Sequence, residues 1–134
     1  TIGRGRDYAT AMEAALKIKE VSYIHAEGFA GGEIKHGPIA MIEHGTPCIV
    51  FVPNQENQDI LSNAQELKTR GAFIIGISEK KHEVFDYWIK VVGPDKFSPI
   101  LRIIPIQALS YYLAVMKGLD PDKPRNLAKS VTVK

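Results

Sequence analysis

Short apolar runs alternate along this chain with longer segments of helical periodicity. Residues 47–52 and 72–77 are apolar at nearly every position, which is typical of strands covered on both faces in a parallel sheet. Residues 87–92 are more mixed and predict a strand nearer the edge of the sheet. Residues 2–5 have the pattern of a strand end followed by a turn. Together these runs predict the strands of a mostly parallel sheet.

Three longer segments, 7–24, 59–70 and 99–116, have apolar residues at helical spacing. Gly71 and Gly118 follow the second and third of them, at positions where helices commonly end. Pro105 falls inside the third segment, and we expect it to loosen the first turns. We expect the core-facing positions of these helices to be Ala11, Ala14, Ala15, Ile18, Val21, Ser22, Ile60, Leu61, Ala64, Leu67, Ile103, Ile106, Leu109, Leu113 and Met116.

The alternation predicts an α/β fold with a doubly wound, mostly parallel sheet flanked by helices. Residues 28–32 are glycine-rich and break the pattern, and residues 33–36 suit one helical turn stopped by Gly37. We expect a single domain over residues 1–119. Residues 120–134 show little periodicity and predict a separate tail. A ligand of such a sheet is expected at the carboxyl ends of the strands.

Composition argues against several classes of function. The net charge is +2, from 17 basic and 15 acidic residues, and no basic stripe indicates nucleic-acid binding. No apolar stretch approaches the roughly 18 residues of a membrane span, and no signal peptide is found, so we expect no membrane partner. The single Cys48 lies in an apolar run, which favours a buried thiol over a nucleophile. A reducing, cytoplasmic setting is the resulting expectation.

Three charged residues share one stripe of the first predicted helix. Glu13, Lys17 and Glu20 are spaced so that all three lie beside the apolar face. One interpretation is a solvated stripe held by salt bridges. The other is a carboxylate–ammonium–carboxylate cluster that lines a pocket and moves protons on a polyol. Spacing alone leaves both interpretations open.

Histidines and carboxylates gather around the glycine-rich break. His25, Glu27, Glu33 and His36 could ligate a metal, but their spacing matches no zinc pattern, and we expect neither a metal nor another cofactor. The loop of residues 35–38 presents His36, and a neutral imidazole can exchange a proton with a sugar hydroxyl at neutral pH. A purely structural role for His36 is the competing interpretation.

The tail carries a candidate nucleophile. Lys129 lies among the apolar residues Leu127, Ala128 and Val131, so this segment could dock onto the domain. A docked lysine in a partly dry pocket loses its proton more readily and attacks carbonyl carbons. A frayed terminus with a surface lysine is the alternative. Residues 76–78, after the second apolar run, give only a weak signal for phosphate binding.

Four segments, taken in order, resemble one enzyme family. They are residues 11–20, 22–27, 32–38 and 124–133. Together they resemble the second sugar isomerase (SIS) domain and the C-terminal tail of glutamine–fructose-6-phosphate aminotransferase (isomerizing), also called glucosamine-6-phosphate synthase. The loop around His36 occurs more widely among SIS domains, whereas the tail is more specific to this family. The resemblance implies a flavodoxin-like three-layer sandwich.

The resemblance assigns roles in a reaction that converts fructose 6-phosphate and glutamine-derived ammonia to glucosamine 6-phosphate. Lys129 corresponds to the lysine that forms a Schiff base with the ketose, with Ala128 and Ser130 beside it as substrate-binding residues. Glu20 corresponds to the carboxylate that moves a proton between C1 and C2. An imine acidifies the neighbouring carbon, so this chemistry needs no cofactor.

The remaining candidates take supporting roles by the same resemblance. His36 corresponds to the histidine that opens the sugar ring, and in the family it reaches the site of the neighbouring subunit. The implied partners are therefore a sugar phosphate and a second copy in a homodimer. Lys17 and Glu13 correspond to a supporting pair that contacts the sugar hydroxyls and maintains the protonation states of the site.

Other parts of that enzyme are not found in this sequence. The family's glutaminase domain uses an N-terminal cysteine, whereas this chain starts with Thr1. The first SIS domain, which supplies much of the sugar-phosphate binding, is missing as well, so we expect a fragment that does not complete the reaction alone. Two alternatives remain: another SIS isomerase or deglycase of sugar phosphates that shares Glu20 and His36, and a non-catalytic module that senses a sugar phosphate.

Overall fold

The protein is an α/β sandwich built on one five-stranded sheet. A computed structural model describes residues 1–54, 57–94 and 96–126. The strands are all parallel and lie in the order β2-β1-β3-β4-β5, which confirms the predicted fold class. Their bounds are Ile2–Gly3 for β1, Phe29–Ala30 for β2, Pro47–Phe51 for β3, Phe73–Ser78 for β4 and Tyr87–Lys90 for β5.

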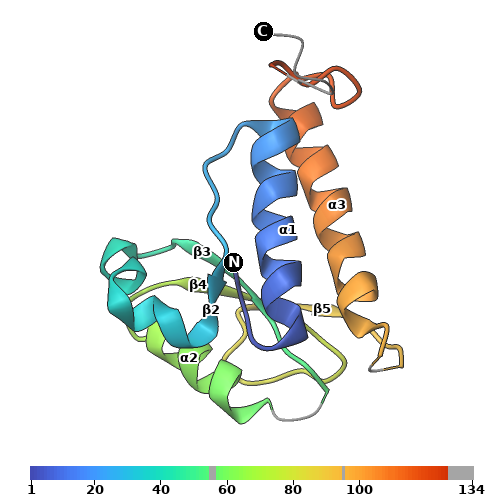
Figure 1. The fold of residues 1–134 in the computed structure, drawn as a ribbon. Coiled ribbons are helices and arrows are strands. Elements are labelled where there is room, and N and C mark those ends of the chain that lie inside the picture. The colour runs from blue at the N-terminus through green and yellow to red at the C-terminus, as the bar shows by residue number, and fades with distance from the viewer. Residues whose placement is uncertain (55–56, 95, 127–134) are drawn as a thin grey trace, which may run out of the picture.

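Helices cover both faces of the sheet. They are α1 (Arg6–Ser22), the 3-10 helices η1 (Gly31–His36) and η2 (Pro38–Met41), α2 (Gln58–Lys68) and α3 (Ser98–Met116). The long helices α1 and α3 lie side by side on one face, while α2 lies on the other with η1 packed beside it (Figure 1). The ends of α1 and α3 extend beyond the sheet, so their last turns stand clear of the strands (Figure 1).

The central strand β3 divides the core in two. Ile49 and Phe51 pack on the side of α1 and α3, whereas Val50 packs on the side of α2, as the alternation of side chains along a strand requires. Helix α1 approaches the sheet closely because the side chains on its inner face are small. Ala11 and Ala14 of this face are fully buried against β3 and α3. The predicted strands and helices are therefore confirmed, with bounds shifted by one or two residues.

Two local predictions were wrong. Residues 28–32 do not simply interrupt the pattern, because Phe29–Ala30 pairs with β1 as an edge strand only two residues long. Such a strand is too short to show periodicity. Met116 was expected to face the core, but it is 84% exposed because the last turn of α3 extends past the sheet. Pro105, in contrast, is accommodated within a continuous helix.

Helix α3 also corrects the expectation that no apolar stretch has the length of a membrane span. Its 19 residues are long and apolar enough by length and composition alone, although this is weak evidence. One face of the helix packs on α1, and its Arg102 side chain is buried in an ion pair with Asp7. Its outer face exposes several large apolar side chains, including Ile104 and Tyr112.

Candidate functional site

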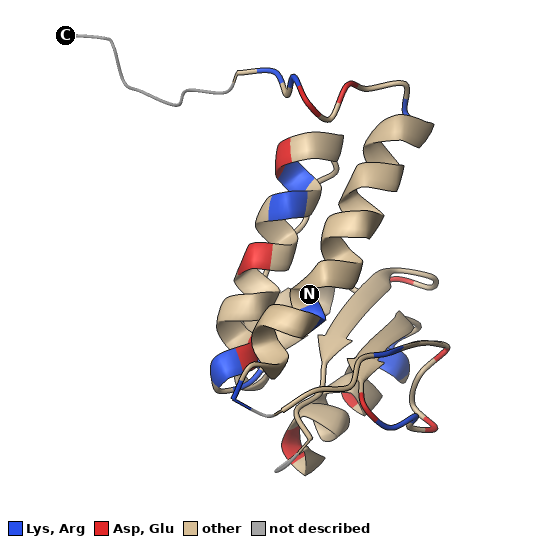
Figure 2. Ribbon diagram, turned by 90° about the vertical axis from the view of Figure 1, so that its right-hand side faces the viewer, with Lys and Arg blue, Asp and Glu red and all other residues tan. Residues whose placement is uncertain are grey.

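The predicted charged stripe forms a connected cluster on α1. The ammonium nitrogen of Lys17 lies 2.5 Å from Glu20 Oε2 and 3.6 Å from Glu13 Oε1. The Lys17 side chain is 29% exposed, so the cluster is half-buried rather than fully solvated. Acidic and basic positions follow one another along α1 in Figure 2. The structure therefore brings these three predicted residues together.

The cluster keeps Lys17 charged. The hydrogen bond to Glu20 is the main cause that raises the pKa of Lys17, partial burial opposes it, and the charges of Glu20 and Glu13 raise it further. Lys17 is therefore an ammonium donor at neutral pH and not a nucleophile. A carboxylate beside a fixed cation can accept a proton from carbon, while the cation donates hydrogen bonds to substrate oxygens.

Glu20 occupies the last turn of α1, where the helix end is fixed by several contacts. Tyr23 adopts a left-handed conformation (φ 57°) and donates its N–H to the carbonyl oxygen of Lys19. Ser22 donates its hydroxyl to the Ile18 carbonyl oxygen at 2.6 Å. Lys117, beyond α3, donates its ammonium to the Ser22 carbonyl oxygen at 2.6 Å. This cation at the C-terminal end of α1 offsets the unfavourable placement of a carboxylate there.

His36 lies apart from this cluster within the chain. It ends η1, and Gly37 follows in a conformation (φ 140°) that favours glycine. Its Nδ1 is 2.8 Å from Glu33 Oε2, and the side chain is 71% exposed. Carboxylate oxygens accept hydrogen bonds, so this contact assigns the donor role to Nδ1. In Figure 1, η1 lies beside α2, far from the C-terminal end of α1.

The other predicted site residues fall into two groups. Lys129, Ala128 and Ser130 lie outside the described residues. His25 and Glu27 form their own pair, with Nε2 and Oε1 3.8 Å apart, separate from the pair of His36. Among residues 1–54, 57–94 and 96–126, no group of three or more His, Cys, Asp or Glu side chains could hold a metal ion.

The weak phosphate candidate at residues 76–78 is engaged within the protein. Ser78 is buried, donates its hydroxyl to the Lys80 carbonyl oxygen at 2.6 Å, and accepts a hydrogen bond from Trp88 Nε1 at 3.1 Å. These bonds use the hydroxyl that a phosphate would need. The Ser78 hydroxyl serves to hold the loop after β4 against β5.

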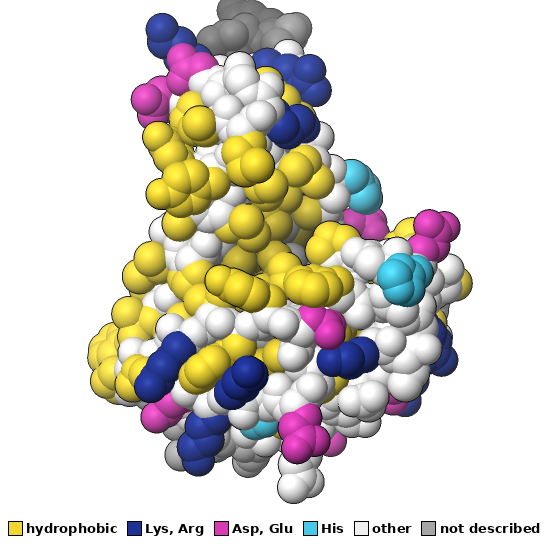
Figure 3. Space-filling view, turned by 180° about the vertical axis from the view of Figure 1, so that it is seen from behind, with side chains coloured by type: hydrophobic (Ala, Val, Ile, Leu, Met, Phe, Trp, Pro, Cys, Tyr) yellow, Lys and Arg dark blue, Asp and Glu magenta, His cyan; other side chains and the backbone are white. Residues whose placement is uncertain are grey.

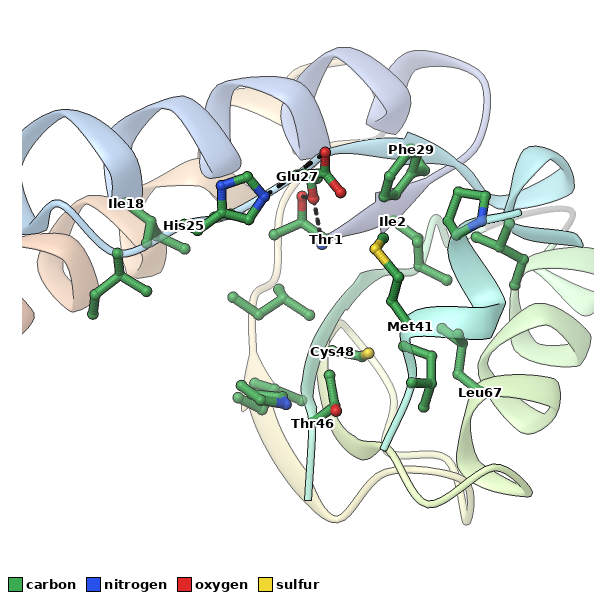
Figure 4. A pocket seen from close by; sticks show the side chains of 18 of the residues that line it. Thr1, Ile2, Ile18, His25, Glu27, Phe29, Met41, Thr46, Cys48 and Leu67 are labelled. Carbon is green, nitrogen blue, oxygen red and sulfur yellow. Dashed lines mark hydrogen bonds and ion pairs between the residues drawn. The ribbon is translucent and has the colours of Figure 1, made fainter. Parts of the chain in front are cut away.

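An apolar cavity of about 380 Å³ opens at the amino ends of the strands. Thr1, Pro47 and Thr46 line it from the strand starts, and His25 and Glu27 lie at its edge (Figure 4). Further apolar side chains come from α1, α3, η2, β3 and the loop after α1; they include Ile18, Leu109, Leu113, Met41, Cys48 and Ile24. Figure 3 shows that hydrophobic side chains also surround a hollow on the rear face.

This cavity differs in chemistry from the charged cluster. Its lining is mostly apolar and includes none of Glu13, Lys17 and Glu20, so it suits an apolar surface better than a sugar. Cys48 contributes its side chain here; the residue is buried as predicted, and burial raises the pKa of its thiol. A neutral thiol is a poor nucleophile.

The carboxyl ends of the strands, where we expected a ligand, hold a buried ion pair. Arg102 Nη1 donates to Asp7 Oδ2 at 2.6 Å, and its Nη2 donates to Asn54 Oδ1 at 2.9 Å. Asp7 and Asn54 follow β1 and β3, the neighbours between which the strand order reverses. The cluster around Lys17 lies towards the opposite end of α1. The expected ligand position and the predicted catalytic residues therefore do not coincide within this chain.

Sequence periodicity missed the residues that fix the end of α1. Tyr23 was assigned to the helix, and Lys117 was not considered. A basic residue just beyond a predicted helix is a known partner for exposed carbonyl oxygens, so Lys117 carried a usable signal. The left-handed conformation of Tyr23 carried none, because tyrosine has no special preference for it.

Comparison with known families decides the classification. A profile of the SIS domain matches residues 1–117. The chain belongs to the SIS domain family. This SIS domain is 52% identical, over 98% of its length, to glutamine–fructose-6-phosphate aminotransferase (isomerizing) from Pyrococcus horikoshii, and 50% identical to the enzyme of that name from Clostridium perfringens. The resemblance found in the sequence is thereby confirmed. The chain spans 23% of the length of these relatives.

Solved structures agree with this SIS classification. The C-terminal domain of glucosamine-fructose-6-phosphate aminotransferase from Francisella tularensis has a TM-score of 0.84 and 39% identity, covering 91% of this chain and 36% of that one. A glucosamine-6-phosphate deaminase from Thermotoga maritima has a TM-score of 0.77 and 29% identity, covering 97% and 39%. In both cases the SIS domain matches a little over a third of a longer chain.

Proposed function

We propose that this chain is the C-terminal isomerase part of a glutamine–fructose-6-phosphate aminotransferase (isomerizing). The observation that carries the proposal is the 50–52% identity to relatives of that name over 98% of the chain. The cluster of Glu13, Lys17 and Glu20 supports it, because isomerisation of a sugar needs a carboxylate held beside hydrogen-bond donors. The glutaminase and first SIS domains would come from the rest of the polypeptide.

The proposed reaction starts at Lys129. Its neutral amine attacks C2 of fructose 6-phosphate, the carbonyl oxygen leaves as water, and an iminium forms. Ala128 and Ser130 contact the substrate beside it. Ammonia then displaces the lysine and gives the ketose imine. The amine that ends on the product is thus the nitrogen released from glutamine.

Glu20 performs the next step in this proposal. It takes a proton from C1, and the electron pair moves into the protonated imine to give an enamine. Glu20 then returns the proton to C2, while the C1 hydroxyl loses its own proton and becomes the aldehyde oxygen. Lys17 keeps its ammonium beside Glu20 throughout and donates to sugar oxygens, with Glu13 as the second partner. His36 from a neighbouring subunit opens the sugar ring. Its separation from α1 within one chain is compatible with that arrangement, in which the chain acts as a homodimer.

Trapping of the imine tests the proposal. The full-length polypeptide is incubated with fructose 6-phosphate, reduced with borohydride and digested, and the adduct is mapped by mass spectrometry. A sugar adduct on Lys129 is expected, with none in Lys129→Arg. Labelling of another lysine, or no labelling, contradicts the assignment of the nucleophile.

A second function follows from the similarity to the deaminase of Thermotoga maritima. A deaminase would release ammonia from an amino sugar phosphate and would need no glutamine. The two functions are separated by supplying ¹⁵N-amide glutamine with fructose 6-phosphate. Transfer of ¹⁵N into the sugar supports the aminotransferase, whereas release of ammonia from glucosamine 6-phosphate without such transfer supports the deaminase.

A further inference from the structure

Strand β1 pairs with only part of the strand beside it. Ile2 of β1 lies opposite Val50 of β3, and the described residues form no other pair between these two strands. On its other side, β3 pairs with β4 over its whole length. Counting back along the two parallel strands brings Thr1 opposite Ile49. The first two residues of β3 therefore lie opposite positions that precede Thr1 in the chain.

The backbone of Thr1 already makes the hydrogen bonds of a strand residue. Its nitrogen donates to the carbonyl oxygen of Glu27 at 2.8 Å, and its carbonyl oxygen accepts the N–H of Phe29 at 2.9 Å. These two bonds follow the pattern of a parallel ladder with the segment that leads into β2. The Thr1 hydroxyl donates to the Ala11 carbonyl oxygen at 2.7 Å, so its side chain faces α1. The ladder between β1 and β2 therefore continues to the first residue of the chain.

The apolar cavity lies in the direction from which the chain reaches Thr1. His25 and Glu27, which precede β2, line one side of it, and Thr46 and Pro47, at the start of β3, line the other. In Figure 4, Thr1 lies between Glu27 and the side chains at the start of β3. The cavity therefore separates two segments that would both neighbour a longer β1.

The lining of this cavity comes from both faces of the sheet. Ile34 and Leu67 belong to the core on the side of α2, whereas Ile18 and Leu113 belong to the core on the side of α1 and α3. A ligand that lay on one face of the sheet would contact one of these two cores. A gap in the plane of the sheet contacts both, and an apolar strand fills such a gap because its side chains alternate between the two faces.

We propose that the two residues preceding Thr1 in the longer polypeptide occupy this cavity, where they continue β1 between β2 and β3. The inference rests on the proposed function, which places further chain before Thr1. The residue directly before Thr1 then lies opposite Cys48 and faces the side of α2. The residue before that one faces α1 and α3, as Thr1 does. Both side chains are apolar, and the cavity is part of the core rather than the sugar site.

Cross-linking to Cys48 tests this register. Neighbouring strands lie about 4.8 Å apart, which is within the Cα separation that a disulfide spans. In the full-length polypeptide, the residue directly before Thr1 is replaced by cysteine, the protein is oxidised, and linked peptides are mapped by mass spectrometry. We expect a disulfide to Cys48. Thr1→Cys is the matched control, and we expect about tenfold less cross-linking because this side chain faces α1.

Hydrogen exchange gives a second readout that needs no substitution. Val52 donates its N–H to Ile77 of β4, and successive N–H groups of a strand point to opposite neighbours, so the N–H of Ile49 points towards β1. A continued β1 supplies an acceptor for it. In the full-length polypeptide we expect the Ile49 amide to exchange at least about 100-fold more slowly than an exposed amide.

Several results would overturn the inference. These are equal cross-linking of the two cysteine variants, a disulfide that joins two polypeptides, no disulfide in either variant, and rapid exchange at the Ile49 amide. Neither measurement uses a sugar. Failure to trap an imine would therefore overturn the proposed reaction and leave this inference standing.

Discussion

Arg102 of α3 and Asp7 of α1 form an ion pair at 2.6 Å, although they lie 95 residues apart and are only 1% and 2% exposed. Burial raises the pKa of Asp7, and the hydrogen bond and charge of Arg102 oppose this rise. Among the residues that the structure describes, Asp7 Oδ1 and Arg102 Nε meet no hydrogen-bond partner. The pair joins the first turns of the two long helices at a considerable cost of desolvation.

Removing one partner of this pair should destabilise the protein strongly. In Asp7→Ala the guanidinium of Arg102 stays buried without its anion, and we expect the free energy of unfolding to fall by about 3–5 kcal/mol. Urea unfolding followed by circular dichroism measures this. The double variant Asp7→Leu with Arg102→Met should recover most of the loss, because the two orphaned atoms disappear with the charges. A double variant as unstable as Asp7→Ala would contradict this account.

Replacing Glu20 by glutamine should abolish proton transfer without abolishing sugar binding. The amide keeps the shape of the side chain but cannot accept a proton from C1. We expect the exchange of the C1 proton with deuterated water to slow by about 100-fold or more in the full-length polypeptide. Nuclear magnetic resonance of fructose 6-phosphate measures the exchange, and trapping at Lys129 reports binding. Exchange at the wild-type rate would show that another base acts.

The raised pKa of Lys17 predicts how the contribution of this residue to stability changes at high pH. A lysine whose pKa is raised on folding adds stability that is fully present below its ordinary value of 10.5 and is lost as pH rises through the folded pKa. Because the pair is partly solvated, we expect Lys17→Met to cost only about 0.5 kcal/mol at pH 7. The difference in unfolding free energy between the two proteins should vanish above the folded pKa. A constant difference up to pH 12 would exclude the ion pair as its cause.

For Asp86 we predict that the contribution to stability depends on pH in the opposite direction. It accepts the N–H of Ile74 at 2.7 Å and lies 3.0 Å from Lys68 Nζ, and the backbone hydrogen bond is the main cause that lowers its pKa. Its contribution to stability is present above the ordinary value of 3.8 and is lost as pH falls through the folded pKa. Asp86→Asn should cost about 1 kcal/mol at pH 7 and nothing at pH 2. Glu43→Gln, at an exposed carboxylate, is the control variant and should leave the stability at pH 7 within about 0.5 kcal/mol of the wild type.

Gly28 permits the chain to cross α1 closely. A Cβ at this position would lie 2.8 Å from the Ala11 carbonyl oxygen and 2.8 Å from Met12 Cα, both of which are backbone atoms of α1. Gly28→Ala should therefore lower the melting temperature, with a loss of about 1–3 kcal/mol. Gly32→Ala is the matched control, because a Cβ there meets nothing within 4 Å. Equal stability of the two variants would show that the backbone can yield at Gly28.

Much of this architecture could be predicted because it depends on local pattern. The runs that became β3 and β4 are buried on both faces, so hydrophobicity alone identified them. The Ala11–Ala14–Ile18 face of α1 follows from helical spacing and needs no knowledge of its partner. The cluster of Glu13, Lys17 and Glu20 is local to one helix, so its spacing predicted its contacts.

Features that depend on distant residues could not be predicted in this way. β2 exists because Phe29–Ala30 meets β1, and two residues carry no pattern of their own. The pairing of Arg102 with Asp7 and the contact of Arg125 with Tyr23 join opposite ends of the chain. Met116 has the correct spacing for the core, but the sheet does not extend far enough to cover it. The roles of Lys129, His36, Glu20, Lys17 and Glu13 in a reaction all remain predictions.

Helix α1 is fastened to the segment containing α3 at both of its ends. Arg102 holds Asp7 in the first turn, and Lys117 holds the Ser22 carbonyl oxygen at the last. These two contacts prevent α1 from sliding along α3 or rotating about its own axis. The carboxylates of α1 therefore keep a fixed position and orientation relative to α3. A ligand that binds there is accommodated by rotation of side chains and not by movement of the helix.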